Sequence, residues 1–248
     1  MCYDDSARPP VDTPPRTGAS GADLVLTSAD GTRFAAYEAR PDDVTGHAVV
    51  VLPDNRGLHR FYADLAVRLA EQGHPAVVVD PYGRTDGVRR DRPADFDPMP
   101  HLMRLTTDGV YGDVATAVRR LRGTGAPVCC LGFCIGGRFA FTATRRTLGL
   151  GLAGAIGFYG ATVPLFGRPG PTDLAGELTG PILGLFGGAD DGIPPDAVAD
   201  FDAALTGAGV DHETVTYPGA PHGFFDLYQR DHTAACADAW QRVLTFLS

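Results

Sequence analysis

The chain has 248 residues, of which 44% are hydrophobic, so it can bury the core of one α/β domain of ordinary size. Its formal net charge of -9 leaves no basic surface for nucleic acid or for an anionic membrane, and we expect neither as a partner. No apolar run approaches the roughly 20 residues of a membrane-spanning helix, and the start of the chain lacks a signal-peptide pattern, so we expect a cytoplasmic protein.

The N-terminal part of the chain divides into an arm and a hairpin. Residues 1–22 are rich in proline, aspartate, threonine and glycine without apolar periodicity, which predicts an extended arm rather than a packed element. Residues 24–39 alternate in polarity around Asp30-Gly31, a favourable turn pair, which predicts two antiparallel edge strands. The folded domain is therefore expected to span residues 23–248.

Further along the chain, apolar runs alternate with helical patterns. Nearly continuous apolar runs, typical of strands buried on both faces of a parallel sheet, occupy residues 47–53, 75–80, 126–133, 152–160 and 181–188. Segments with helical spacing occupy residues 61–72, 107–122, 136–148, 195–207 and 231–247. This alternation predicts an open, doubly wound α/β sheet with its site at the carboxyl ends of the strands.

The sharpest local signal is Gly132-Phe133-Cys134-Ile135-Gly136-Gly137, which lies between an apolar run and a helical segment. This is the pattern of a nucleophile elbow with cysteine in the serine position. Glycines on both sides relieve the clashes of a tight strand-to-helix turn, and the N-terminus of the following helix favours the thiolate that attacks. We therefore predict Cys134 as a nucleophile; an unreactive buried cysteine in a glycine-rich turn is the alternative.

In a hydrolase with such an elbow, an acid follows a later strand and a histidine lies near the C-terminus. Here Ala189-Asp190-Asp191 follows the run at 181–188, and His222-Gly223-Phe224 follows a short strand near the end of the chain. We predict His222 as the base, because three weak signals agree in order and context. Asp190 is favoured to orient the imidazole because it lies closer to the strand end, and Asp191, which heads into a turn, is the alternative.

The oxyanion of such a reaction needs two N–H donors. One belongs to the residue after the nucleophile, Ile135, and the other to the turn after the strand at 47–53, where Asn55 is our candidate. The five cysteines are scattered and odd in number, which favours reduced thiols, with Cys129 and Cys130 as core residues. The other histidines lack metal-ligand spacing, so we expect no metal.

Together these motifs resemble the dienelactone hydrolase (carboxymethylenebutenolidase) family. The likeness extends over about residues 24–247 and depends on the elbow, on Gly187-Gly188-Ala189-Asp190 and on His222-Gly223-Phe224. It implies an α/β-hydrolase fold, a doubly wound, mostly parallel sheet of about eight strands flanked by helices, in a single domain without a cofactor. We expect a monomer, with a dimer as the alternative.

The resemblance also implies a mechanism. Cys134, His222 and Asp190 form the triad, and Asn55 and Ile135 donate to the oxyanion. The implied reaction is hydrolysis of a lactone or small activated ester through an acyl-enzyme on the cysteine. A general carboxylesterase or thioesterase is the nearest alternative. A non-catalytic hydrolase fold that binds a small molecule is the alternative from another class, and the complete triad argues against it.

Two positions depart from the family pattern. The best-known members carry a glutamate in contact with the resting thiol, and the matching position here is Asp54. Asp54 is thus a candidate for modulating the thiol, whereas a cap of its own turn or a pair with Arg56 is the alternative. Those members also hold the substrate carboxylate with arginines, and Asp226, which would repel a carboxylate, takes the place of one of them.

Residues 83–101 form a long, charged segment with prolines directly after a predicted strand, and we expect them to form a surface excursion over the site. The arginines of this segment that could bind an anionic substrate instead are Arg84, Arg89, Arg90 and Arg92. Arg84, Arg89 and Phe224 are our candidate substrate contacts. The sequence does not assign dienelactone itself as the substrate.

Overall fold

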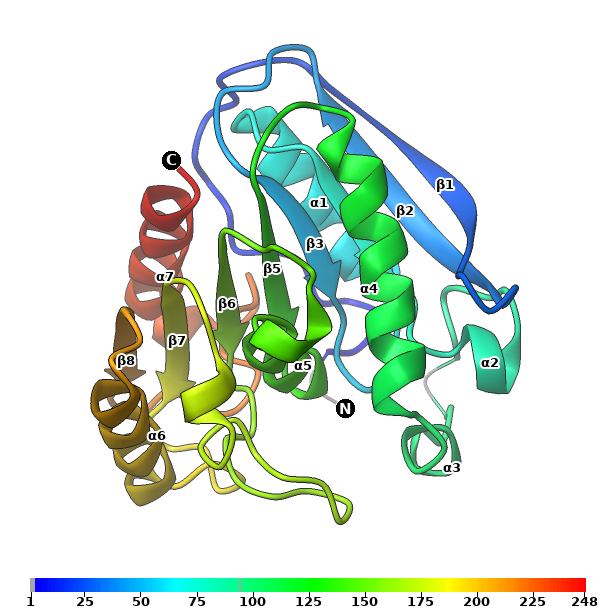
Figure 1. Cartoon of the computed structure of the whole chain (residues 1–248). Helices are drawn as coiled ribbons and strands as arrows, with labels where there is room; N and C mark the ends of the chain where they lie inside the picture. The colour runs from blue at the N-terminus through cyan, green and yellow to red at the C-terminus, as the bar shows by residue number, and fades with distance from the viewer. Residues whose placement is uncertain (1–2, 94) are drawn as a thin grey trace.

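The centre of the protein is an eight-stranded sheet in the order β1-β2-β4-β3-β5-β6-β7-β8 (Figure 1). The computed structural model describes residues 3–93 and 95–248. The strands are β1 (Ala19–Thr27), β2 (Arg33–Pro41), β3 (Ala48–Leu52), β4 (Ala76–Val79), β5 (Val128–Phe133), β6 (Gly154–Phe158), β7 (Ile182–Gly187) and β8 (His212–Tyr217). From β4 to β8 in this order, neighbouring strands pair in parallel, whereas β1 pairs with β2 and β2 pairs with β4 in the antiparallel direction. The predicted fold class is therefore confirmed.

Helices cover both faces of this sheet (Figure 1). They are α1 (Arg60–Glu71), α2 (Gly83–Asp86), α3 (Met99–Leu102), α4 (Thr107–Arg122), α5 (Ile135–Ala143), α6 (Pro195–Ala208) and α7 (Thr233–Phe246), with 3-10 turns η1 (Arg146–Leu148), η2 (Ala175–Glu177) and η3 (Arg230–His232). The five predicted helices are present, although α5 ends earlier than expected. The sequence did not predict the single-turn helices α2 and α3. Within the described residues, no helix has the length and apolar character that crossing a membrane requires.

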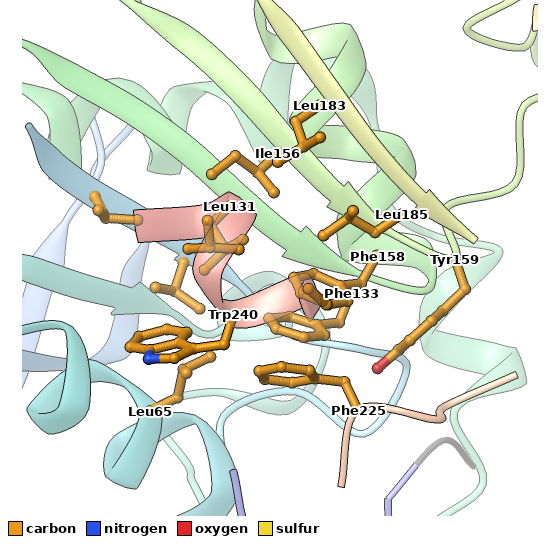
Figure 2. Packing of buried hydrophobic residues seen from close by; sticks show 14 of the residues in the cluster. Leu65, Leu131, Phe133, Ile156, Phe158, Tyr159, Leu183, Leu185, Phe225 and Trp240 are labelled. Carbon is orange, nitrogen blue, oxygen red and sulfur yellow. The ribbon is translucent and has the colours of Figure 1, made fainter. Parts of the chain in front are cut away.

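The strands are apolar throughout because both faces of the sheet are covered. Along β3, Val49 and Val51 enter one hydrophobic cluster, whereas Val50 and Leu52 enter the other. Helices α1 and α7 pack on the first cluster and α4 packs on the second. Figure 2 shows part of the first cluster, with Trp240 of α7 beside the strands. This double burial makes the sheet a rigid base for the loops at the carboxyl ends of its strands.

The N-terminal segment differs from the prediction. Strand β1 begins at Ala19, inside the predicted arm, and β2 is not an edge strand because it pairs with β4 on its other side. Tyr3 and Ala7 are each only 2% exposed. The described part of the arm is thus extended but not free of the domain, because its apolar side chains Tyr3 and Ala7 pack in the hydrophobic core. Residues 1 and 2 lie outside the described residues.

Candidate active site

Cys134 lies directly after β5, at the start of α5, in a backbone conformation that few residues other than glycine adopt (φ 55°). The turn is tight because its two ends nearly touch. A Cβ atom on Gly132 would collide with the backbone of Gly136, and one on Gly136 would collide with the carbonyl groups that end β3. Both positions therefore require glycine, and the turn holds the thiol at the wall of a cavity.

His222 and Asp190 meet beside this thiol. Nδ1 of His222 lies 2.6 Å from Oδ2 of Asp190, which follows β7 and is 5% exposed. The other carboxylate oxygen, Oδ1, accepts the N–H of Gly192 at 2.9 Å, so both oxygens are held. Asp191 is exposed to solvent. The structure thus brings Asp190, and not its neighbour, to the imidazole.

The charges of these groups depend on one another. Burial alone would lower the pKa of His222, but the hydrogen bonds to Asp190 and to Cys134 outweigh burial and raise that pKa to about 10. The imidazole thus has the carboxylate of Asp190 at Nδ1 and the sulfur of Cys134 as a second partner. This arrangement favours an imidazolium paired with a thiolate, the reactive form of cysteine.

The two predicted oxyanion donors lie at the same cavity. Ile135 is the first residue of α5, where a backbone N–H has no partner inside the helix. Asn55 lies in the turn after β3, and its backbone carbonyl accepts a hydrogen bond from the hydroxyl of Tyr82 at 2.7 Å. Both residues line the cavity that holds Cys134. The close packing of α5 against the end of β3 brings these two donors together.

The cavity has a volume of about 220 Å³. Its polar wall contains Cys134, His222 and Asn55. The remaining lining residues are mostly apolar and come from α3, from the start of α5, from the segment after β6 and from the turn after β7: Met99, Leu102, Ile135, Tyr159, Ala161, Leu165, Phe166, Gly192 and Ile193. Among the described residues, no arginine lines this cavity. The arrangement can therefore hold a small uncharged group against a nucleophile.

Asp54, in the same turn as Asn55, is completely buried. Oδ1 accepts the N–H of Arg56 at 2.9 Å, whereas Oδ2 has no hydrogen-bond partner among the described residues. Burial, and secondly the charge of Cys134, raise the pKa of Asp54 to about 7. His59 Nε2 lies 3.9 Å from Oδ1, but burial lowers the pKa of His59 to about 3, so this ring is neutral. Asp54 thus caps its turn, and the charge of Cys134 contributes to its raised pKa.

Replacing Asp54 by asparagine separates these two roles. Asparagine still caps the turn, but it carries no charge above pH 7, where the aspartate is ionised and opposes a thiolate at Cys134. We expect the pH profile of Cys134 alkylation by iodoacetamide to move to lower pH, and kcat/KM to change with it. Asp191→Asn is the matched control, because Asp191 is exposed. An unchanged alkylation profile together with an unchanged kcat/KM would leave Asp54 with the cap alone.

The structure does not bring the candidate arginines to the cavity. Arg84 pairs with Asp30 and with the buried Asp113, at 2.9 and 2.6 Å. Arg89 is largely exposed and lies 3.8 Å from Asp86. The charged segment does reach the site, as expected, but through Met99. The cations of this segment are used in ion pairs, some with neighbouring carboxylates such as Asp86 and others, as for Arg84, with carboxylates distant in sequence.

The other candidates also have structural partners. Arg92 is fully buried and makes two parallel hydrogen bonds to Asp80, at 2.7 and 3.0 Å. Arg90 pairs with Asp23 and Asp91. Phe224 is fully buried among aromatic rings and does not line the cavity, so the structure does not place it as a substrate contact.

Sequence reasoning missed most of the apolar wall and Tyr159. Tyr159 follows β6 directly, lines the cavity and has its ring centroid 4.8 Å from that of His222. Its place at the carboxyl end of a predicted strand was a usable signal, since sites in such sheets gather there. Leu165 and Phe166 follow a few residues later in an irregular segment, and no pattern in the sequence predicted that this segment folds over the site.

Comparison with known proteins gives consistent similarities. A family model described as the dienelactone hydrolase family matches residues 34–248. A carboxymethylenebutenolidase of Rhodococcus opacus is 30% identical over 263 residues, covering 99% of this chain and 96% of that protein. A provisionally named carboxymethylenebutenolidase of Salmonella typhimurium is 31% identical over 245 residues, covering 93% and 88%. The crystal structure of a provisionally named dienelactone hydrolase of Klebsiella pneumoniae superposes with a TM-score of 0.80 at 28% identity, covering 92% of this chain and 98% of that chain.

Proposed function

The chain belongs to the dienelactone hydrolase family, and from that premise we propose that it hydrolyses a small ester or lactone through an acyl-enzyme on Cys134. One observation carries the proposal. The imidazole of His222 is held at Nδ1 by Asp190, at 2.6 Å, and also hydrogen-bonds to Cys134 at the wall of a cavity. A nucleophile, a base and a group that orients the base are the parts that covalent acyl transfer requires.

The proposed reaction has two halves. The thiolate of Cys134 attacks the carbonyl carbon, and the N–H groups of Asn55 and Ile135 stabilise the oxyanion that forms. The carbon–oxygen bond to the leaving group breaks, and the leaving oxygen takes the proton of His222. Water then gives a proton to the neutral imidazole and attacks the thioester. The carbon–sulfur bond breaks, which releases the acid and restores the thiolate–imidazolium pair.

The cavity favours an uncharged substrate. Residues Met99, Leu102, Leu165, Phe166 and Ile193 form its apolar wall. A carboxylate placed against this wall would lose hydration without gaining a cation, which costs several kcal/mol even after relaxation. A carboxylesterase acting on neutral, small acyl groups therefore fits better than a hydrolase of dienelactone, whose carboxylate needs a partner.

Two esters with the same leaving group test this proposal. We expect 4-nitrophenyl butyrate to be hydrolysed with a kcat/KM about 100-fold above that of mono-4-nitrophenyl succinate, because the succinyl group adds a carboxylate at the far end of a similar chain. The measurement is the initial rate of 4-nitrophenol release at pH 8. Equal values for the two esters would contradict the assignment of a neutral substrate, and no turnover of either would argue against an esterase.

A further inference from the structure

An N-terminal tyrosine, outside the motifs discussed so far, is buried next to the active site. Tyr3 is 2% exposed, and its ring stacks on that of Phe61 with a centroid distance of 3.9 Å. Its ring also meets Phe133 of β5 edge-on at 6.3 Å. In Figure 1 the first described part of the chain, in dark blue, lies near the edge of the sheet where the parallel strands end. A polar segment thus places one aromatic side chain at the base of the site.

The hydroxyl of Tyr3 makes hydrogen bonds to two groups among the described residues. It donates to the backbone carbonyl of Phe225 at 3.0 Å, and it hydrogen-bonds to the hydroxyl of Tyr159. A carbonyl cannot donate, so the single proton of the Tyr3 hydroxyl is used on Phe225. Tyr159 must then be the donor to Tyr3. The resulting chain runs from Tyr159 through Tyr3 to the backbone three residues after His222.

Tyr159 connects this chain to the base. It lines the catalytic cavity, its ring centroid lies 4.8 Å from that of His222, and its backbone has an unusual φ of 37°. A non-glycine residue keeps such a conformation only where its surroundings hold it. In Figure 2 the hydroxyl of Tyr159 points toward Phe225, below the strands. Tyr3 therefore holds the Tyr159 ring through its hydroxyl, while the same ring lies beside the imidazole of His222.

The rest of the segment is tied to the same loops. The N–H of Arg8 donates to Asp226 Oδ1 at 3.0 Å, and the carbonyl of Arg8 accepts the N–H of Leu227 at 2.9 Å. Asp5 pairs with Arg56, next to the oxyanion donor Asn55. The Asp5 side chain is 72% exposed, so this pair contributes little by itself. The buried Tyr3 is the stronger of the two ties.

We propose that Tyr3 is a positioning residue of the active site, which acts by holding Tyr159 against the ring of His222 and by fixing the turn that carries His222. The proposal rests on the proposed function, in which His222 is the base. The N-terminal segment thereby becomes part of the active site, although its described residues include neither a triad residue nor a residue of the cavity wall.

Tyr3→Phe tests the proposal because it keeps the aromatic stack and removes only the hydroxyl. We expect kcat, per site titrated by the acyl-enzyme burst, to fall roughly three- to tenfold, the value of one buried hydrogen bond, with KM within twofold. Tyr159→Phe removes the same bond from its other end and should cause a similar loss. The double variant should be no slower than the slower single variant, because both substitutions remove one interaction.

Thr13→Val is the matched control. It removes another hydrogen bond of the same segment, from Trp240 Nε1 at 2.9 Å, away from the cavity. It should lower Tm but leave kcat per titrated site within twofold.

A wild-type kcat in Tyr3→Phe, or losses of kcat that multiply in the double variant, would overturn the role of Tyr3. If Tyr3→Phe fails to fold, Tyr159→Phe decides: a wild-type kcat there overturns the proposal equally. Cys134→Ala judges the proposed function separately, so that an inactive alanine variant beside a fully active Tyr3→Phe enzyme would reject only the inference.

Discussion

Replacing Cys134 by alanine is expected to abolish turnover and to leave the fold intact. The thiol forms the covalent bond, whereas the tight turn depends on Gly132 and Gly136, which this substitution keeps. Loss of the nucleophile should lower kcat/KM by a factor of about 10⁴ or more. The measurement is ester hydrolysis at saturating and limiting substrate, with Tm recorded for the same preparation.

Cys129→Ala is the control for this substitution. Cys129 is buried in β5, and burial raises the pKa of its thiol to about 12, so it is unreactive. This variant should lose some stability through the smaller side chain but keep its activity per folded molecule. Cys134→Ala retaining more than about a tenth of the wild-type kcat/KM, where a lost triad member costs orders of magnitude, would exclude the mechanism.

Asp190→Asn is expected to cause the second largest loss, roughly 10³-fold in kcat/KM. The carboxylate accepts the proton on Nδ1 of His222, at 2.6 Å, and so leaves Nε2 to exchange protons with the thiol and the leaving group. An asparagine amide can donate to Nδ1 instead, which favours the wrong tautomer. The substitution also removes the carboxylate charge that raises the pKa of His222, so the imidazolium is less stable.

The adjacent carboxylate provides the comparison. Asp191→Asn is the same chemical change one residue further along, at an exposed position. Its kcat/KM should stay within twofold of the wild-type value, as for most surface substitutions. Equal losses in the two variants, or a larger loss at Asp191, would show that the orienting carboxylate has been assigned to the wrong residue.

The sheet and the meeting of Cys134, His222 and Asp190 at one site were predictable, because their signals are local or follow the chain order. A run such as 181–188 is apolar throughout since both of its faces are covered, and this composition is visible in one segment. Cys134 is identified by the glycines that its turn requires. Asp190 and His222 follow it in the order that the fold imposes, each at the end of a strand.

The roles of the charged segment and of the arm were not predictable, because they depend on contacts between distant parts of the chain. Arg84 was expected near the substrate from its charge alone, but its partners Asp30 and Asp113 lie far away in the sequence. Tyr3 is one aromatic residue in a polar segment, and its partner Tyr159 is 156 positions away. No periodicity reveals such a pair, since periodicity reports only on the element in which it occurs.

The most direct test of the account is to trap the covalent intermediate. Wild-type enzyme is mixed with excess 4-nitrophenyl butyrate and quenched in acid during the first turnover, and the protein is mapped by peptide mass spectrometry, with Cys134→Ala treated in parallel. We expect a burst of 4-nitrophenol about equal to the enzyme concentration and one butyryl group on the peptide that contains Cys134, with neither in the alanine variant. A butyryl group on another residue, or a burst that persists without the thiol, would contradict it.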